Sequence, residues 1–525
     1  MAHASGPLGR GSPTTQAMLA AMSSETEWAP LLARVRASLR THTDLPRAAV
    51  ALDTLLAVAR GDVAALPFDA VPRHTLRLYT DASLLRSALD LALGAGEGRA
   101  YWLAAVERVD RAIIVAGAVG ERRAEWAQGL IGEVQGVLEA GRMAPPAWPG
   151  DGGGGAGTGL NGDEEDDSGD TDPAGLNNDE DGPRTRADAP PHPNGSSADP
   201  RPAKRQRRSP PAPAPPPAPP TLFAPAPVPD TTTFPTPAAY AAHLSAQPLI
   251  LRGYLAGSPA SPPWPALTRW QSAAYLLSRV GEGRVVPVEV GAAYDDSSWG
   301  QRIVPFRDFL HAAGWDVAPE TAPETAPETG AEGDLLATSG SADPPPLYLA
   351  QHALFAQFPA LERDTAVPDY VWSEPPGPGG YAAPPDYLVN VWVGCGGSRI
   401  VSPAHTDPYF NAYAQVLGRK RVWLAPPDAT AHMYAYGKGS ADDDDESKSP
   451  LAAEYMGNTS AVPILRGDGF TDAHKAAFPA FFEHVYPRAL EAVLDPGDLL
   501  LMPPGWWHAM RGESEAMSWS VSFWY

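Results

Sequence analysis

Residues 145–229 constrain the fold of this chain most, because they combine glycine runs, repeated Pro-Ala and an acidic cluster at 163–167 with few apolar side chains. Such a composition buries too little apolar surface to offset the entropy lost on ordering. The whole chain of 525 residues carries 60 prolines and 50 glycines, which excludes one compact globule. We therefore predict a disordered linker over residues 144–232 between two folded parts.

The part before the linker, residues 25–143, is rich in Ala, Leu, Val and Arg. Its apolar residues recur at spacings of three and four, as in Leu31, Leu32, Val35 and Leu39. This spacing is typical of an amphipathic α-helix. The pattern predicts an all-helical module over residues 25–143, after a disordered N-terminus at residues 1–24.

The part after the linker, residues 233–525, has short runs of β-branched and aromatic residues between turn signals. Its last third predicts strands at 388–393, 412–417, 421–424, 492–494, 499–502, 506–510 and 517–524. The sequence Asp-Pro-Gly-Asp at 495–498 predicts a tight turn between two of them. Many short strands without intervening helices are typical of an antiparallel barrel or jelly roll.

Three low-complexity insertions interrupt this second part, near residues 317–344, 375–384 and 438–450. The first contains a triple Ala-Pro-Glu-Thr repeat, the second is rich in proline and glycine, and the third carries an acidic run. Because long surface loops cost little stability, we expect all three on the surface of one domain.

The charge balance narrows the choice of partners. Lys and Arg number 39 and Asp and Glu number 62, which gives a net charge of −23. This balance disfavours direct nucleic-acid or membrane binding and favours basic protein partners. The single cysteine, Cys395, excludes an internal disulfide framework and a Cys-rich zinc module. The sequence has neither an apolar membrane span nor an export signal, so we expect a soluble, intracellular monomer.

A short basic cluster, Lys204–Arg208, lies in the predicted linker. Such clusters are read by the nuclear import machinery, and this one predicts a nuclear location, with the cytoplasm as a further compartment. The alternative interpretation is a solvated run of charge without a function.

A candidate metal site begins at His405 and Asp407, which lie two residues apart in a predicted strand region and therefore project to the same face. Taken alone, such a pair is more commonly a histidine hydrogen-bonded to a nearby aspartate for structural reasons. A second histidine, His508, lies on another predicted strand and favours the metal. Two imidazoles and one carboxylate are the donor set of the non-haem Fe(II) oxygenases.

Lys420 adds a further element, because a cosubstrate with a distal carboxylate needs a fixed cation in the barrel mouth. The alternative interpretation is a solvent-facing strand residue. The other histidines that we considered lack a carboxylate at strand spacing and are interpreted as surface or core residues: His243, His352, His432, His474 and His484.

Six stretches carry a family resemblance: QPLI at 247–250, VPVEVG at 286–291, YLAQH at 348–352, VPDY at 367–370, QVLGRK at 415–420 and SWSVSFW at 518–524. Through them, residues 233–525 resemble the JmjC-domain 2-oxoglutarate oxygenases, a family that includes protein arginyl hydroxylases and lysine demethylases. The resemblance implies an α+β multidomain protein in which a helical N-terminal module precedes a double-stranded β-helix (cupin, jelly-roll) JmjC domain.

The resemblance also implies roles for individual residues. His405, Asp407 and His508 would bind Fe(II), and Lys420 would pair with the distal carboxylate of 2-oxoglutarate. The residues implied to hydrogen-bond this cosubstrate are Tyr370, Ser402 and Asn411. An arginine pocket is implied as well, with Glu289 as the partner of the guanidinium and Tyr294 and Trp299 as aromatic walls. Trp299 has ordinary core packing as its alternative.

Three functions remain open from the sequence. The first is a dioxygenase that uses Fe(II), 2-oxoglutarate and O₂ to hydroxylate a protein side chain, with arginine expected because of Glu289. The second is a demethylase of methyl-lysine in histones or other chromatin proteins. The third is a non-catalytic JmjC-like scaffold, which the complete set of metal ligands disfavours.

Overall fold

The computed structural model describes residues 13–22, 27–67, 70–143, 225–257, 262–296, 298–319, 345–397, 399–436, 456–514 and 516–525. Residues 144–224 of the predicted linker, with the basic cluster Lys204–Arg208, lie outside this set. The same holds for most of two predicted insertions, residues 320–344 and 437–455. The insertion near 375–384 is described and connects two elements without helix or strand.

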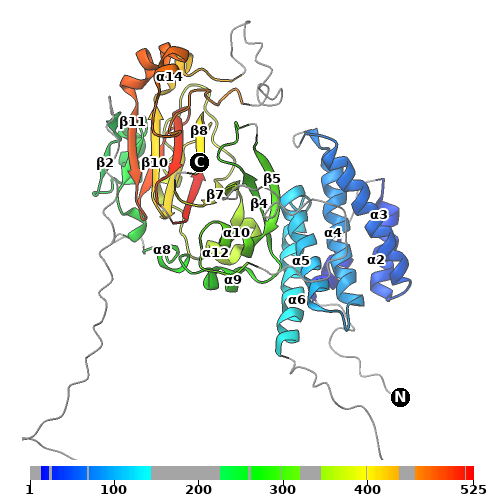
Figure 1. The fold of residues 1–525 in the computed structure, drawn as a ribbon. Helices are drawn as coiled ribbons and strands as arrows, with labels where there is room; N and C mark the ends of the chain where they lie inside the picture. Colours follow the sequence, from blue (N-terminus) through cyan, green and yellow to red (C-terminus); the bar gives the residue numbers. More distant parts are fainter. Residues whose placement is uncertain are drawn as a thin grey trace, which may run out of the picture. The chain divides into compact units, whose positions relative to one another are not determined.

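The N-terminal part is helical, as predicted (Figure 1). Its described helices are α1 Pro13–Ala21, α2 Ala29–Thr41, α3 Leu45–Ala64, α4 Arg73–Leu93, α5 Arg99–Ala116 and α6 Arg123–Met143. The prediction that residues 1–24 are disordered is wrong for α1. Its side chains Met18 and Leu19 are buried in the same apolar cluster as side chains of α2 and α6, and this packing stabilises a helix too short to form alone.

The C-terminal part is a β-sandwich of two sheets. The first has the order β1-β11-β10-β13-β8, with β1 Ala226–Pro227, β11 Leu490–Leu494, β10 Lys420–Ala425, β13 Trp507–Gly512 and β8 Val401–Thr406. The second has the order β2-β3-β12-β9-β14-β7-β6-β4-β5, with β2 Asp230–Thr231, β3 Leu249–Leu251, β12 Leu499–Met502, β9 Asn411–Leu417, β14 Ser518–Trp524, β7 Leu388–Gly394, β6 Leu347–His352, β4 Val285–Val290 and β5 Gly300–Pro305.

The seven predicted strands are all present, and the turn at Asp495–Asp498 closes with a hydrogen bond from Asp498 N to Asp495 O of 3.0 Å. Two details differ from the expected antiparallel barrel. The sheets are open, and β1 and β2 pair in parallel with β11 and β3. Both short strands come from residues that the composition assigned to the linker, and buried Val228 between them joins the core.

Short helices complete the fold. They are α7 Pro237–His243, η3 Tyr254–Ala256, α8 Ala266–Arg269, α9 Ala273–Val280, α10 Phe306–Ala312, α11 Leu354–Gln357, α12 Pro359–Glu362, η4 Asp369–Trp372, η5 Pro427–His432, α14 Asp472–Ala477, η6 Phe481–Val485 and η7 Tyr486–Arg488. None of the helices among the described residues is long and apolar enough to span a membrane.

The alternation of side chains along each strand decides which ones face the interior of the sandwich. On β12, Leu499 and Leu501 pack in the cluster that includes Trp270 and Trp519, whereas Leu500 and Met502 pack in the cluster between the sheets. On β13, Trp507 and Ala509 pack against η6, on the outer face. His508, between them, therefore faces the interior.

Candidate functional site

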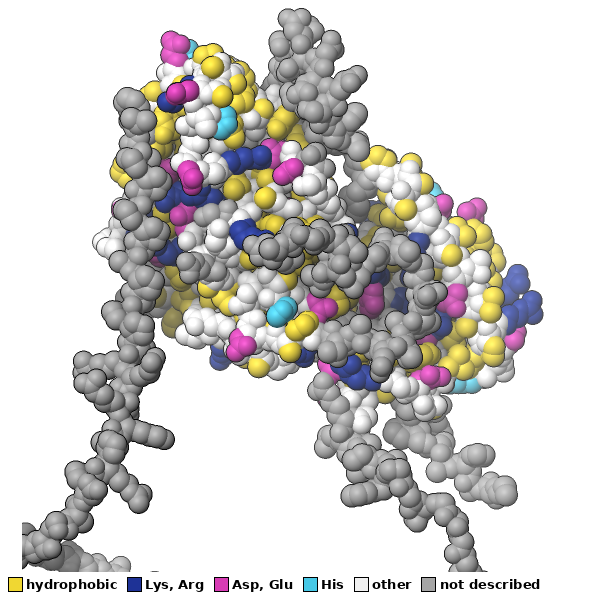
Figure 2. Space-filling model, viewed as in Figure 1, with side chains coloured by type: hydrophobic (Ala, Val, Ile, Leu, Met, Phe, Trp, Pro, Cys, Tyr) yellow, Lys and Arg dark blue, Asp and Glu magenta, His cyan; other side chains and the backbone are white. Residues whose placement is uncertain are grey.

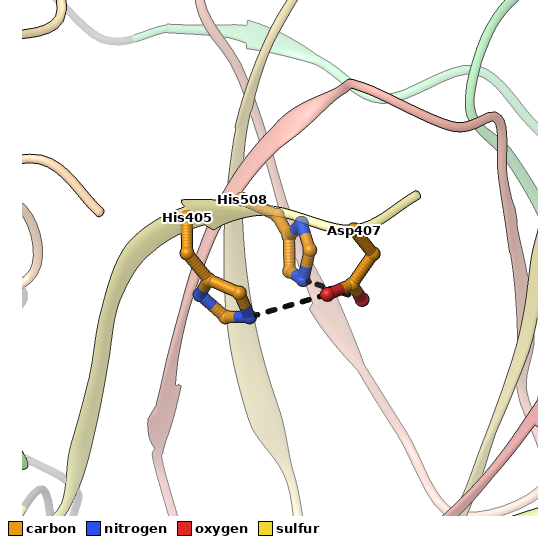
Figure 3. Close-up of side chains that lie close together, drawn as sticks. All are labelled: His405, Asp407 and His508. Atoms are coloured by element: carbon orange, nitrogen blue, oxygen red, sulfur yellow. Dashed lines mark ion pairs between the residues drawn. The ribbon is translucent and has the colours of Figure 1, made fainter. Parts of the chain in front are cut away.

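The two sheet neighbours β8 and β13 bring the candidate metal ligands together (Figure 3). His405 of β8 and His508 of β13 are direct partners across the antiparallel pair, and their rings lie 4.2 Å apart. Asp407 follows the end of β8, with carboxylate oxygens 3.9 Å from His405 Nε2 and 3.5 Å from His508 Nε2. One donor atom of each residue lies within 4.8 Å of the others, so the group could bind a metal ion.

Backbone carbonyls orient both imidazoles toward this point. The Nδ1 atom of His405 lies 2.8 Å from Pro403 O, and that of His508 lies 3.2 Å from Trp506 O. Because a carbonyl only accepts, each Nδ1 carries a proton, and in the neutral imidazole this tautomer leaves the lone pair of Nε2 free to bind a metal. Burial, together with the nearby His405, lowers the pKa of His508 to about 4, so this ligand is neutral.

A cavity of about 310 Å³ opens beside the triad. Strands of both sheets contribute to its wall, together with residues 456–459, which pair with β8. Its lining includes His405, Asp407, Ser402, Glu289, Tyr294, Tyr348, Trp392, Asn458, Thr459 and Trp524. His405 and Asp407 therefore face a partly open space large enough for small molecules and a substrate side chain.

Lys420 is buried at the start of β10 and does not face solvent, so that alternative is wrong. Its Nζ donates to Tyr413 OH at 2.8 Å and to Tyr348 OH at 3.3 Å, and no carboxylate of the described residues pairs with it. Burial lowers its pKa to about 7. Gly418 places it there: the turn needs a φ of +67°, and a Cβ would clash with Met517 O.

Ser402 and Asn411 also face the interior. Ser402 lines the cavity, and its hydroxyl is a hydrogen-bonding neighbour of the buried Tyr348 hydroxyl. Asn411, at the start of β9, is 3% exposed, and its Oδ1 has no hydrogen-bond partner among the residues that the structure describes. A buried amide oxygen without a partner is rare in folded proteins and suits a site that binds a further group.

Tyr370 does not reach this site, in contrast to the role that the resemblance implied. It lies on η4, its hydroxyl donates to Pro235 O at 2.6 Å, and its ring packs edge-on against Tyr240. The tyrosine beside Lys420 is Tyr348 of β6. Tyr348 belongs to another of the matching stretches, but the sequence alone does not show which face of its strand points inward.

Glu289 of β4 lines the same cavity as the triad. Burial raises its pKa to about 7, and no Lys or Arg of the described part pairs with it. Tyr294 also lines the cavity, where its ring meets the His405 ring at 80° and its hydroxyl lies 3.2 Å from Thr459 Oγ1. Burial raises the pKa of Tyr294, so it is a neutral wall.

Trp299 is half-buried behind Glu289 and is not part of the cavity lining. Its indole lies close enough to Glu289 to oppose the rise in the carboxyl pKa, although Nε1 lacks the geometry of a regular hydrogen bond. The structure thus brings together Glu289 and Tyr294 at the cavity and places Trp299 next to them.

Known proteins match the C-terminal half. The family model described as "Cupin-like domain" matches residues 237–525. "Jumonji C domain-containing protein 5" of Drosophila melanogaster is 35% identical over 263 residues, which are 50% of this chain and 52% of that protein. "Lysine-specific demethylase 8" of Danio rerio is 33% identical over 262 residues, 50% of each protein.

"Lysine-specific demethylase JMJ30" of Arabidopsis thaliana is 31% identical over 287 residues, 54% of this chain and 53% of that protein. The aligned part thus spans about half the length of these curated relatives. The family model covers more than half of the sequence and ends with its last strand. The chain therefore belongs to the family of proteins with a cupin-like JmjC domain.

Proposed function

We propose that this chain is an Fe(II)- and 2-oxoglutarate-dependent dioxygenase that hydroxylates an arginine side chain of a protein. The observation that supports this most is the carboxylate of Glu289, which pairs with no Lys or Arg of the described residues and lines the same cavity as His405 and Asp407. Relatives with JmjC domains support the reaction class.

His405, Asp407 and His508 would hold the iron, because two neutral imidazoles and one carboxylate match the donor set of non-haem Fe(II) oxygenases. When bound, iron and 2-oxoglutarate supply the oxidising chemistry: the cosubstrate and O₂ become succinate and CO₂, and one oxygen atom enters a substrate C–H bond. The chain's own contribution is to orient the reactants and exclude water.

Lys420 would hold the distal carboxylate of 2-oxoglutarate. It is a desolvated cation whose described partners are two neutral hydroxyls, so a carboxylate would gain a charge-assisted contact of about 1.5–3 kcal/mol. Tyr348, Ser402 and Asn411 offer hydrogen bonds around the same space. Tyr348 thus takes the role that the sequence assigned to Tyr370.

Glu289 would bind the substrate cation. A planar guanidinium pairs with both oxygens of a carboxylate and stacks on rings, and Tyr294 supplies a ring beside it. The ammonium group of lysine is a point charge, so it pairs with both carboxylate oxygens and stacks on a ring less well than a planar guanidinium does. The carboxylate therefore favours arginine over lysine.

The second candidate is a demethylase of methyl-lysine, which would share the iron, the cosubstrate and the first half of the reaction. Two of the relatives reported above carry the name lysine-specific demethylase. The third, a non-catalytic scaffold, is disfavoured by the assembled triad and the buried Lys420.

The two enzymatic candidates are separated by mass spectrometry. Purified protein with Fe(II) and 2-oxoglutarate is incubated with peptides that contain arginine or methyl-lysine. A gain of one oxygen on arginine supports the hydroxylase, whereas loss of a methyl group from lysine supports the demethylase.

A matched pair of variants tests the pocket. Glu289→Gln should cost roughly 2–5 kcal/mol in kcat/KM for an arginine peptide, because the guanidinium loses its counter-charge. The control is Glu483→Gln, which changes a carboxylate that is 74% exposed. Peptide-free turnover of 2-oxoglutarate should survive in both. Full arginine hydroxylation by Glu289→Gln would refute the pocket and favour the demethylase.

Partners and location remain proposals. The excess of acidic residues suits a basic target such as a histone, and we propose a monomer that binds no nucleic acid or membrane. Figure 2 shows acidic and basic side chains interspersed on one face, without a continuous basic patch among the described residues. Deleting Lys204–Arg208 should move a fluorescent fusion out of the nucleus, and a wholly cytoplasmic parent fusion would contradict the nuclear proposal.

A further inference from the structure

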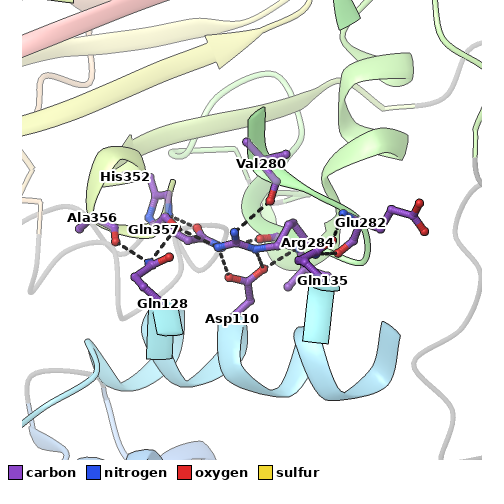
Figure 4. A network of polar contacts seen from close by, with 10 residues as sticks. Asp110, Gln128, Gln135, Val280, Glu282, Arg284, His352, Ala356 and Gln357 are labelled. Carbon is purple, nitrogen blue, oxygen red and sulfur yellow. Dashed lines mark hydrogen bonds and ion pairs between the residues drawn. The ribbon is translucent and has the colours of Figure 1, made fainter. Parts of the chain in front are cut away.

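A buried ion pair joins the helical module to the residue that precedes β4 (Figure 4). Arg284, which precedes β4, donates through Nε and Nη2 to the two carboxylate oxygens of Asp110 on α5, each at 2.7 Å. Asp110 also accepts the backbone N–H of Val285 at 3.1 Å. The side chains of Asp110 and Arg284 are 0% and 4% exposed, so this contact is fully desolvated.

Gln357, at the end of α11, extends the contact to β6. Its Nε2 donates to Val285 O at 2.7 Å, and its Oε1 lies 2.7 Å from Nε2 of His352, the last residue of β6. Arg284 Nη2 also donates to Gln357 O at 2.8 Å. Hydrogen bonds made by side chains therefore connect the start of β4 to the end of β6.

The two strands pair with each other only at their other ends, although β4 also pairs with β5 along its whole length. The β4–β6 ladder consists of Glu289 with Tyr348 and Val290 with Leu347. Toward Val285 the strands are no longer partners, and β6 is irregular between Leu349 and His352. The paired positions are those of the proposed substrate carboxylate and of the tyrosine beside Lys420.

We propose that Asp110 is a positioning residue for the arginine pocket: by fixing Arg284 and Val285 it sets the path of β4 and thereby the place of Glu289. Glu289 lies four residues along the strand, roughly 13 Å at about 3.3 Å per residue. Further contacts from the module, Gln128 to Gln357 O at 3.0 Å and Gln135 to Glu282 O at 2.5 Å, brace the same region. This role rests on the proposed function and assigns the helical module a part in it.

The test compares Asp110→Asn with a matched control in the same module, Asp81→Asn. Asp81 is also fully buried and pairs with Arg123, but both partners belong to the module itself. Each variant thus loses one buried carboxylate, and only Asp110→Asn weakens contacts to Arg284 and Val285 at the start of β4. A second variant, Arg284→Lys, keeps the cation and removes the two-pronged contact, in case Asp110→Asn does not fold.

Two measurements test whether Asp110 positions β4. Hydrogen exchange of the β4 amides should be at least about tenfold faster in Asp110→Asn than in Asp81→Asn, with β13 amides unchanged. KM for an arginine peptide should rise about 10- to 100-fold, with peptide-free turnover of 2-oxoglutarate kept within about twofold. Arg284→Lys should show the same pattern in milder form.

Equal β4 exchange and equal KM in the Asp110 and Asp81 variants would overturn the proposal and leave Asp110 as a contact that only stabilises the fold. The exchange experiment does not depend on activity. If the parent protein hydroxylates no arginine peptide, the proposed function fails, while faster exchange confined to β4 still supports the positioning role.

Discussion

Replacing Lys420 with methionine should make the cosubstrate-free protein more stable. The fold buries this ammonium without a carboxylate, and burial lowers its pKa from 10.5 to about 7. A difference of 3.5 pKa units at about 1.36 kcal/mol each is about 5 kcal/mol of cost while the group is charged. Methionine has a similar length and no charge, so the variant should recover most of that cost at pH 7.

The pH dependence follows from the direction of the shift. At and below pH 7, Lys420 is charged in the unfolded chain, and the folded protein has to bury the same charge. The loss of folding stability caused by Lys420 is therefore largest there. Between pH 7 and 10.5 only the unfolded chain holds the proton, and the parent protein gains stability as the pH rises. The unfolding free energy of Lys420→Met should exceed that of the parent by only about 2 kcal/mol at pH 9.

Urea unfolding at pH 7 and pH 9 measures both values, with Lys475→Met as the control. Lys475 lies on α14, its side chain is 49% exposed, and the change should leave the unfolding free energy nearly unaltered. The same Lys420→Met protein should bind 2-oxoglutarate about 10- to 100-fold more weakly, because it lacks the charge-assisted contact. A variant less stable than its parent at pH 7, or a difference that does not change with pH, would refute the reasoning.

Three further outcomes are expected. His405→Ala should abolish binding of Fe(II) or Mn(II), measured by calorimetry, while thermal unfolding still reports a folded protein; retained stoichiometric binding would contradict the triad. Tyr348→Phe should raise KM for 2-oxoglutarate several-fold, whereas Tyr370→Phe, whose hydroxyl bonds Pro235, should not; the reverse result would restore the original assignment. Because burial raises the pKa of Glu289 to about 7, KM for an arginine peptide should fall about tenfold from pH 6 to pH 8, and Glu289→Gln should remove this slope.

The sequence predicted the parts of the site that depend on local spacing. His405 and Asp407 share a face because they are two residues apart in an extended segment, and the structure places them so. That His508 pairs directly with His405 follows from the register of β8 and β13, which no spacing along the chain reveals. The choice between Tyr348 and Tyr370 likewise required knowing which side of the sheet faces inward.

The fold was predictable to a similar degree. The seven strands predicted in the last third were found to within about two residues, whereas β3 to β6 were not predicted individually. The elements α1, β1 and β2 were missed because their few apolar groups gain stability only from tertiary contacts. The contact of Asp110 with Arg284 was also invisible, since it joins parts of the chain on either side of the linker.

The division of the site between two sheets has a consequence for how such a protein diversifies. The candidate metal donors lie on or next to β8 and β13, and Lys420 lies on β10 of the same sheet, whereas Glu289 on β4 and Tyr348 on β6 belong to the other sheet. Under the proposed function, changes at Glu289 and in the loop after β4 would alter which side chain is accepted while leaving the metal donors in place. Under this proposal, the reaction can be conserved while the preferred substrate changes. Duplicated copies of the gene can then acquire new targets through substitutions in a single strand.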